Sequence, residues 1–372
     1  MKKVLLYGMC GMDNLGDDLM YHAINRFLNA KDYSVEFVSR MNWKTYFSEE
    51  KVPECVRLPI YETKRIQFEQ RLKKYLPLLK KAYDKSKFQK LLNFFEMHHY
   101  EALIFLGGGY ITSNETVMSI DELENILLLV ITARQCGMKV VFSGLTVGPF
   151  HKGDSAENLA KEIFKHADAV SVREQYSYDE LKRLGIDSVL TGDNIFLLDA
   201  EKEEQPRYIL VNLKAHKEQS ANIEKLIKEI LDLCKKEDIP IEVLPFRSDQ
   251  NSEEYIMNKR FSVLLREHGI RSEIVVPNTV RQLLELYRGA QFVIGSAYHS
   301  VALSMLFHKK IFTWYEGNYY TYKIRGLLEQ FSLNDSVKSN QIFEAFNEKE
   351  DPADKVRKNV LNEWNAIVEM LE

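Results

Sequence analysis

The sequence predicts an α/β protein made of two Rossmann-like halves, whose mainly parallel sheets face a central cleft. Apolar runs with the length of buried strands alternate with helix-length amphipathic segments along the whole chain, which is the pattern of parallel sheets built from βαβ units. A charged stretch that contains a proline, residues 199–206, divides this alternation into two groups. At 372 residues the chain also exceeds what one core usually supports. We therefore predict one domain at residues 1–200 and a second at residues 207–372.

The first half opens with a strand at Lys3–Tyr7, where an apolar run ends in a glycine turn. Similar runs that end in glycine or polar residues predict further strands at Ser34–Ser39, Ala102–Leu106, Lys139–Ser143, Ala169–Val172 and Ser188–Leu190. The segments between them predict helices at Asp17–Asn29, Arg65–His98, Asp121–Cys136, Ala156–His166 and Ser177–Leu184.

The second half repeats the same alternation. Its predicted strands are Tyr208–Asn212, Ile241–Pro245, Glu273–Val276, Gln291–Ile294 and Lys310–Trp314. Its predicted helices are Ala221–Lys236, Ser252–Glu267, Val280–Tyr287, Ser300–Phe307 and Ile324–Phe331. A last helix is predicted at Ala353–Leu371, and packing back on the first half is one arrangement open to it.

Composition and charge narrow the class of protein. A hydrophobic content of 45% and a charged content of 28% are typical of globular proteins, and a net charge of −4 argues against general nucleic-acid binding. We expect neither a signal peptide nor a spanning helix, because no apolar run approaches about 18 residues. The four cysteines are scattered, and no His, Cys, Asp or Glu spacing indicates a metal. We therefore predict a cytoplasmic protein with neither a metal nor a cofactor.

One segment, Lys64–Lys90, carries ten Lys or Arg residues against only Glu69 and Asp84. Aromatic and aliphatic side chains interleave with these charges. Such a basic amphipathic region fits peripheral contact with an anionic membrane surface or a lipid-phosphate acceptor. A solvated helix that covers the sheet fits it equally well.

The clearest candidate site follows the predicted strand Gln291–Ile294. There Gly295 leads into a polar cluster and then into an apolar helix, and the cluster holds Ser296, Tyr298, His299 and Ser300. Backbone N–H groups and the positive end of the helix dipole converge at such a helix start, which favours an anionic ligand. Ligands of open α/β sheets bind outside the carboxyl ends of the strands, and a histidine there can transfer a proton near neutral pH. The sequence therefore indicates an enzyme that acts on an anionic substrate.

Glycine-containing loops follow three predicted strands of the first half, at residues 8–18, 107–110 and 143–150. Glycines leave room for the close approach of a ligand, and several of them at one sheet edge favour a cleft there. The candidate ligand contacts in these loops are Asn14, Asp17, Gly108 and Gly109. Helix capping by Asp17 or Asp18 and simple tight turns are the alternatives. The first loop does not have the GxGxxG spacing, so it lends little support to NAD binding.

Two charged residues end other strands of the first half. Arg173 follows Ala169–Val172, where an arginine can bind a carboxylate or phosphate through two parallel hydrogen bonds. A surface pair between Arg173 and Glu174 is the alternative. Asp193 follows Ser188–Leu190 and could act as a base, orient a ligand hydroxyl or cap a turn.

As an ordered set, these motifs resemble the polysaccharide pyruvyl transferase family over about residues 1–335. The resemblance rests on the first glycine loop, the triple glycine 107–109, Gly148–Pro149, residues 171–174, residues 192–193, residues 289–295 with His299, and residues 323–328. It implies a GT-B-like fold of two Rossmann-like domains. It also implies transfer of the pyruvyl group of phosphoenolpyruvate to two hydroxyls of a sugar in a cell-surface polysaccharide or its precursor. The products are a cyclic ketal and phosphate.

This reaction requires cationic and backbone donors for the donor substrate, a proton donor to its methylene carbon, and a base. We assign these roles to Arg173 with the strand-to-helix turns, to His299, and to Asp193. A phosphate contact is an alternative role for His299. For the sugar acceptor, nucleotide-linked and lipid-linked forms are both open.

The chain departs from the family pattern at one position. Family members usually carry an arginine two residues before the histidine, where this chain has Ala297. A lost charge-assisted hydrogen bond costs about 1.5–3 kcal/mol. Lys323 and Arg325 are candidate substitutes, and a different donor or a reduced activity are alternatives. A GT-B-type glycosyltransferase that uses a nucleotide sugar and a catalytically silent glycan-binding homologue remain competing functions.

Overall fold

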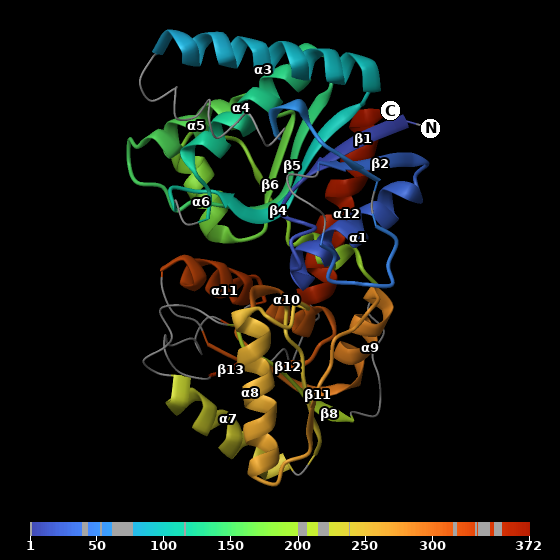
Figure 1. The fold of residues 1–372 in the computed structure, drawn as a ribbon, viewed down its shortest axis with the longest axis vertical. Coiled ribbons are helices and arrows are strands. Elements are labelled where there is room, and N and C mark those ends of the chain that lie inside the picture. The colour runs from blue at the N-terminus through green and yellow to red at the C-terminus, as the bar shows by residue number, and fades with distance from the viewer. Residues whose placement is uncertain are drawn as a thin grey trace.

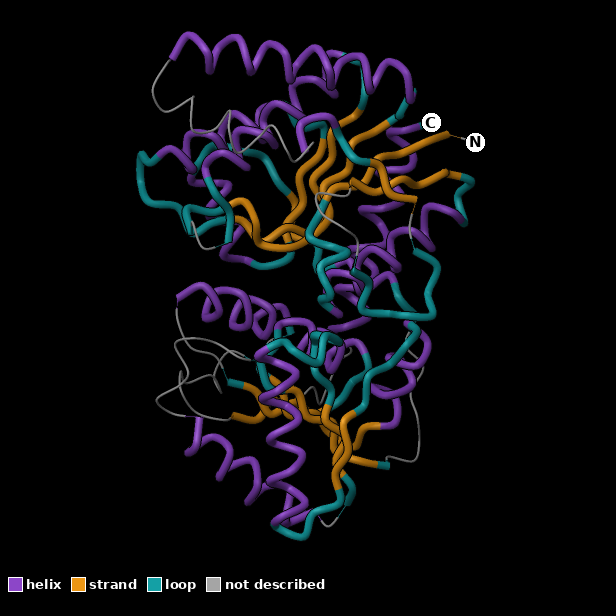
Figure 2. The backbone as a smooth tube through the Cα atoms, viewed as in Figure 1, coloured by secondary structure: helices purple, strands orange, loops and turns teal. Residues whose placement is uncertain are grey.

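Two β-sheets, each covered by helices on both faces, form the two halves of the molecule (Figures 1 and 2). The computed structural model describes residues 2–38, 44–52, 54–61, 77–114, 117–199, 207–214, 223–237, 239–314, 318–331, 333, 343–345 and 352–372. The arrangement confirms the predicted α/β class with two mainly parallel sheets. The predicted domain boundary at residues 200–207 falls mostly outside the described residues and stays a prediction.

In the described part of the N-terminal half, seven parallel strands lie in the order β3-β2-β1-β4-β5-β6-β7. They are β1 (Lys2–Tyr7), β2 (Tyr33–Val38), β3 (Glu54–Val56), β4 (Ala102–Ile111), β5 (Lys139–Val147), β6 (Ala169–Val172) and β7 (Val189–Leu190). β1 pairs with both β2 and β4, with Leu5 opposite Leu103, so the strand order reverses between β1 and β4. Such a switch point leaves a crevice outside the carboxyl ends of the strands.

The helices of this half explain why its strands are so apolar. They are α1 (Leu15–Asn29), α3 (Pro77–His98), α4 (Ile120–Gln135), α5 (Ser155–Lys165) and α6 (Gln175–Arg183), with short 3₁₀ turns η1 (Pro59–Tyr61) and η2 (Asn194–Leu197). Figure 2 shows them on both sides of the strands. A parallel sheet covered on both faces requires continuous apolar strands, and every residue of β4 is buried.

The C-terminal half contains six described strands in the order β10-β9-β8-β11-β12-β13, all parallel except the β12–β13 pair. The strands are β8 (Tyr208–Asn212), β9 (Ile241–Val243), β10 (Ser272–Ile274), β11 (Ala290–Gly295), β12 (Lys310–Thr313) and β13 (Phe343–Ala345). The helices are α7 (Ile223–Glu237), α8 (Glu253–Glu267), α9 (Val280–Gly289), α10 (Tyr298–Leu306) and α11 (Asn318–Gln330). In Figure 1, α10 and α11 lie on the side of this half that faces the N-terminal half.

The last helix, α12 (Pro352–Leu371), follows the C-terminal sheet in sequence but packs on the N-terminal half (Figure 1). The indole Nε1 of Trp364 donates a hydrogen bond to Asn194 Oδ1 at 2.9 Å. Lys2 Nζ donates to the carbonyl of Leu371 at 2.5 Å, so the two ends of the described chain lie together. α12 therefore completes the face of the first sheet next to η2.

Several element boundaries differ from their predicted positions. β4 and β5 continue to Ile111 and Val147, through glycines that the sequence predicts as turns, because the two strands pair along most of their length. β3 and β13 are three-residue edge strands, too short to leave a clear pattern. In the predicted helix 65–98, residues 65–76 lie outside the described residues.

Replacing Gly192 by alanine is expected to loosen α12 from the sheet. A Cβ at Gly192, where φ is +153°, would lie 2.5 Å from Val356 Cγ1. The substitution therefore combines backbone strain with overpacking, and we expect the free energy of unfolding to fall by about 2–5 kcal/mol. Urea denaturation measures this loss.

Gly185→Ala is the matched control, because Gly185 also has a positive φ of +75° but has nothing within 4 Å of an added Cβ. It should cost only about 1–2 kcal/mol. Adding Val356→Ala to Gly192→Ala should restore part of the lost stability. A Gly192→Ala protein as stable as the unsubstituted chain would rule out this packing.

Candidate active site

The turn between β11 and α10 brings His299 to the N-terminal half. Gly295 is required in this turn because a Cβ there would lie 2.4 Å from Ser300 Oγ. Ser296 Oγ accepts a hydrogen bond from Lys214 N, and Ser300 Oγ accepts one from the Tyr287 hydroxyl, both at 3.1 Å. The two serines thus hold the turn together within their own half.

The His299 ring is held between two parts of the N-terminal half. It packs so closely on the start of α1 that a Cβ at Gly16 would lie 1.8 Å from His299 Nδ1. His299 Nε2 lies 3.5 Å from Asp193 Oδ2, and within the described structure this nitrogen has no partner in hydrogen-bond geometry. The ring therefore has a fixed position and a carboxylate beside it.

A buried ion pair supports this carboxylate. Arg173 Nη1 donates to Asp193 Oδ2 at 2.6 Å, and Arg173 Nε donates to Thr146 Oγ1 at 2.9 Å. Glu174 Oε1 lies 3.5 Å from Arg173 Nε, and the guanidinium stacks on the Tyr298 ring at 4.1 Å. The Arg173 side chain is only 1% exposed. The alternative of a surface pair between Arg173 and Glu174 is therefore wrong, because the pair is buried.

The surrounding charges keep Asp193 ionised. Burial by itself would raise the pKa of Asp193, but the charges of His299 and Arg173 hold it below its usual value of 3.8. Burial would also lower the pKa of Arg173, whereas the neighbouring carboxyl groups of Asp193 and Glu174 raise it. At neutral pH the pair is thus a guanidinium and a carboxylate.

The glycine loop after β1 is shaped by its own polar residues. Asn14 caps α1, since its Oδ1 accepts hydrogen bonds from Gly16 N at 3.1 Å and from Asp17 N at 3.5 Å. The aspartates, which the sequence leaves open as caps, do not fill this role. Asp18 is buried and accepts hydrogen bonds from two backbone N–H groups, each at 2.7 Å. Burial nevertheless raises its pKa to about 7.

The same loop binds the loop that follows β9. The Asp13 carboxylate accepts hydrogen bonds from the backbone N–H groups of Ser248 and Asp249, both at 2.9 Å. Arg247 Nη1 donates to the carbonyl of Met12 at 2.6 Å. These bonds connect the loops after β1 and β9, which lie at the carboxyl ends of strands in the two sheets.

A cavity of about 210 Å³, the central cleft, lies where these loops meet. It is bordered by the glycine loop after β1, the glycines of β4, the start of α10 and the loops after β8 and β9. The sequence-predicted residues that line it are Asn14, Asp17, Gly108, Gly109, Arg173, Tyr298, His299 and Lys323. The structure therefore brings together most of the candidate residues from both halves.

Other predicted residues lie elsewhere. Asp193 is fully buried behind Arg173 and His299, and Ser296 and Ser300 are buried in the turn before and at the start of α10. Arg325 pairs with Glu329 at 2.8 Å, and its side chain is 58% exposed. Arg325 is therefore not among the residues that line the cleft, which corrects its assignment as a substitute for the arginine missing at Ala297.

Sequence reasoning missed two cations that line the cleft, Lys214 and Arg247. Lys214 follows β8 and Arg247 follows β9, so both lie at the carboxyl ends of parallel strands. That position is the signal that could have identified them. Ala297 itself also lines the cleft, which places it beside the cations that remain.

The described residues contain neither a candidate metal site nor a candidate membrane-spanning helix. No group of three or more His, Cys, Asp or Glu side chains in this part of the chain could hold a metal ion. None of its helices combines the length and apolarity needed to cross a bilayer. The predicted membrane contact of residues 64–90 stays a prediction, because residues 64–76 are not described. Within that segment, Lys87 Nζ donates to Asn125 Oδ1 at 2.8 Å and so faces α4.

Comparison with known proteins gives a family and a fold. The chain matches the polysaccharide pyruvyl transferase family over residues 14–313, while no curated protein matches it in sequence. MurG from Acinetobacter baumannii is 12% identical with a TM-score of 0.52, covering 97% of this chain and 93% of that one. UDP-GlcNAc 2-epimerase from Methanocaldococcus jannaschii is 11% identical with a TM-score of 0.55 and the same coverage. At such identities the likeness shows only the fold, which is GT-B-like.

Asp193 is expected to make the protein sensitive to acid. Because its folded-state pKa lies below the usual value of 3.8, its stabilisation is present at neutral pH and is lost as the pH falls through that value toward the folded-state pKa. Asp193→Asn should remove this loss and, at neutral pH, break the closest ion pair of the buried Arg173 charge at a cost of about 3–5 kcal/mol. Urea denaturation from about pH 7 to about pH 3 measures both effects.

Asp187→Asn serves as the control, because Asp187 is exposed and its loss should change neither the stability nor its pH dependence. If Asp193→Asn matched the unsubstituted protein at every pH, the ion pair would not be part of the folded structure.

Proposed function

Because the chain belongs to the polysaccharide pyruvyl transferase family, we propose that it transfers the pyruvyl group of phosphoenolpyruvate to two hydroxyls of a sugar. The sugar belongs to a cell-surface polysaccharide or its precursor, and the products are a cyclic ketal and inorganic phosphate. The observation that carries this proposal is the central cleft. Its described lining combines His299 with four cationic side chains, Arg173, Lys214, Arg247 and Lys323.

Phosphoenolpyruvate carries a carboxylate and a phosphate, and the cleft offers cations from both halves for these groups. Arg173 is already paired with Asp193, so its remaining donors contribute less net charge than a free guanidinium. Lys214, Arg247 and Lys323 are therefore the side chains that replace the positive charge missing at Ala297. The N-terminus of α10 adds backbone N–H groups at the same place.

The reaction begins when a sugar hydroxyl attacks C2 of the donor while His299, in its protonated form, gives a proton to the methylene carbon. A C2–O bond and a C3–H bond form, and the hydroxyl proton passes to a base. The second hydroxyl then attacks C2, the C2–O bond to phosphate breaks, and phosphate leaves with the electron pair and takes up the proton of that hydroxyl.

The sequence alone predicts that Asp193 acts as the base, but its surroundings favour a different role. A carboxylate with a lowered pKa, bonded to a guanidinium, is a poor proton acceptor. We propose instead that Asp193 orients His299 and stabilises its protonated form through the 3.5 Å contact. Asp17 lines the cleft directly and is the better candidate to accept the hydroxyl proton.

Calorimetric titration of phosphoenolpyruvate, with UDP-GlcNAc in a parallel titration, tests the donor. Saturable binding of phosphoenolpyruvate supports the proposal. Binding of the nucleotide sugar with no binding of phosphoenolpyruvate, even when both are present, contradicts it and favours a glycosyltransferase. Absence of any binding favours the silent homologue.

Lys214→Met is expected to weaken phosphoenolpyruvate binding by roughly tenfold or more, since one charge-assisted hydrogen bond is worth about 1.5–3 kcal/mol. Calorimetry measures the dissociation constant. Arg325→Met is the control, because Arg325 is also a cation of the C-terminal half but is not among the described residues that line the cleft. Equal affinities in Lys214→Met and the unsubstituted protein would remove Lys214 from the donor site.

His299→Gln should lower turnover by about 100-fold or more, because general acid catalysis typically contributes 10²–10⁴-fold. Phosphate release from phosphoenolpyruvate with a panel of nucleotide-linked sugars measures turnover. Phosphoenolpyruvate binding should change much less than turnover. A variant that retained full turnover would exclude His299 as the acid.

A further inference from the structure

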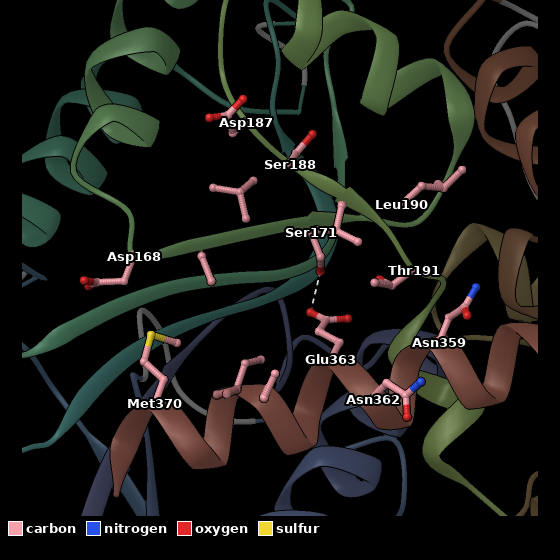
Figure 3. A pocket seen from close by; sticks show the side chains of 15 residues that line it. Asp168, Ser171, Asp187, Ser188, Leu190, Thr191, Asn359, Asn362, Glu363 and Met370 are labelled. Atoms are coloured by element: carbon pink, nitrogen blue, oxygen red, sulfur yellow. Dashed lines mark hydrogen bonds between the residues drawn. The ribbon is translucent and has the colours of Figure 1, made fainter.

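A second and larger cavity, of about 660 Å³, lies between α12 and the strands β6 and β7 (Figure 3). We call it the α12 groove. Its walls are mainly apolar and include Ala169, Leu190, Ile367 and Met370. None of the cations of the central cleft lines it. A volume of this size, apolar walls and a few polar groups are the usual properties of a small-molecule site.

The groove contains buried oxygens that lack hydrogen-bond partners. Thr191 is 4% exposed, and within the described structure its Oγ1 has no partner in hydrogen-bond geometry, although it lies near enough to the Glu363 carboxyl to lower its pKa. Oε2 of Glu363 and Oγ of Ser188 likewise have no partner in hydrogen-bond geometry there. The other oxygen of Glu363 accepts a hydrogen bond from Ser171 Oγ at 2.5 Å, and Figure 3 shows the Glu363 carboxyl between Ser171 and Thr191. Buried polar atoms normally have partners, so these atoms point to a bound molecule that supplies donors.

The charges of the groove select the kind of molecule. Every ionisable side chain among its described lining residues is acidic, namely Asp168, Asp187 and Glu363. Asp168 is already paired with Arg134 at 2.5 Å. Burial raises the pKa of Glu363, and the hydroxyls near it offset only part of that rise. The described lining offers no cation to an anion such as phosphoenolpyruvate, whereas an ammonium group would offer three N–H donors and a charge that favours the ionised form of Glu363.

We propose that the α12 groove binds a small organic amine with an apolar body, whose ammonium group lies at Glu363 and Thr191. The apolar body packs against Ile367 and Met370 on one side and Leu190 on the other. This site takes a ligand of opposite charge to the substrate of the central cleft. The inference does not depend on the function proposed for that cleft.

A matched series of phenethylamine, 2-phenylethanol and phenylacetate tests the proposal, because the three share an apolar body and differ in the charge of the head group. Calorimetry or ligand-observed NMR on the full chain should show saturable binding of phenethylamine. The alcohol should bind roughly tenfold or more weakly, and the carboxylate not measurably. Equal binding of the amine and the alcohol, tighter binding of the carboxylate, or no binding of the amine at millimolar concentration would overturn the proposal.

Two variants locate the binding site. Ala366→Trp places a large side chain in the groove at an exposed position of α12 and should abolish phenethylamine binding. Leu361→Trp is the control, since Leu361 is 42% exposed on the same helix and does not line the groove. Glu363→Gln should lower the affinity for phenethylamine by roughly tenfold and leave that for the alcohol little changed. Binding that survives Ala366→Trp in a folded protein would place the amine elsewhere.

Discussion

The contact between Arg173 and Asp193 is the interaction on which the site depends. Both side chains are almost fully buried, and a buried ion pair is tolerated only when each charge has its partner and its remaining hydrogen bonds. Asp193 obtains them from Arg173 and from the backbone N–H of Ile195 at 3.0 Å. The carboxylate is therefore fixed at the end of β7, and it fixes in turn the environment of His299, which belongs to the other half of the molecule. A histidine supplied by one sheet thus acquires its electrostatic partner from the other.

The loops that border the central cleft also bind each other. Asp13 accepts hydrogen bonds from two backbone N–H groups of the loop after β9, and Arg247 of that loop donates a hydrogen bond to the carbonyl of Met12 in the first glycine loop. Asn14 and Asp17 come from one half, whereas Lys214 and Lys323 come from the other. The described lining of the cleft therefore combines polar and acidic side chains of one half with lysine side chains of the other.

Local patterns in the sequence predicted the fold well and the site in part. Apolar runs and glycine turns identified the strands, because parallel strands that are buried on both faces are continuously apolar and do not alternate between apolar and polar residues. His299 and the glycine loops were predicted because they follow strands directly.

Ser296 and Ser300 were misassigned because hydroxyls at a helix start can bond within their own half. The protonation state of Asp193 could not be predicted, since it depends on Arg173, twenty residues away in sequence and 2.6 Å away in space. Lys214 was missed because nothing in a polar loop distinguishes a cation that faces a cleft from one that faces water.

The position of α12 has a consequence for how the chain folds as it is made. Synthesis releases the N-terminal half first, yet the face of its sheet beside Asn194 is covered by Trp364, near the other end of the described chain. Until the ribosome has completed residues 352–371, the first half exposes apolar surface that chaperones and proteases recognise. The N-terminal half therefore finishes folding only after the C-terminal half has been translated, and a message truncated before α12 yields an incomplete first domain rather than an intact one.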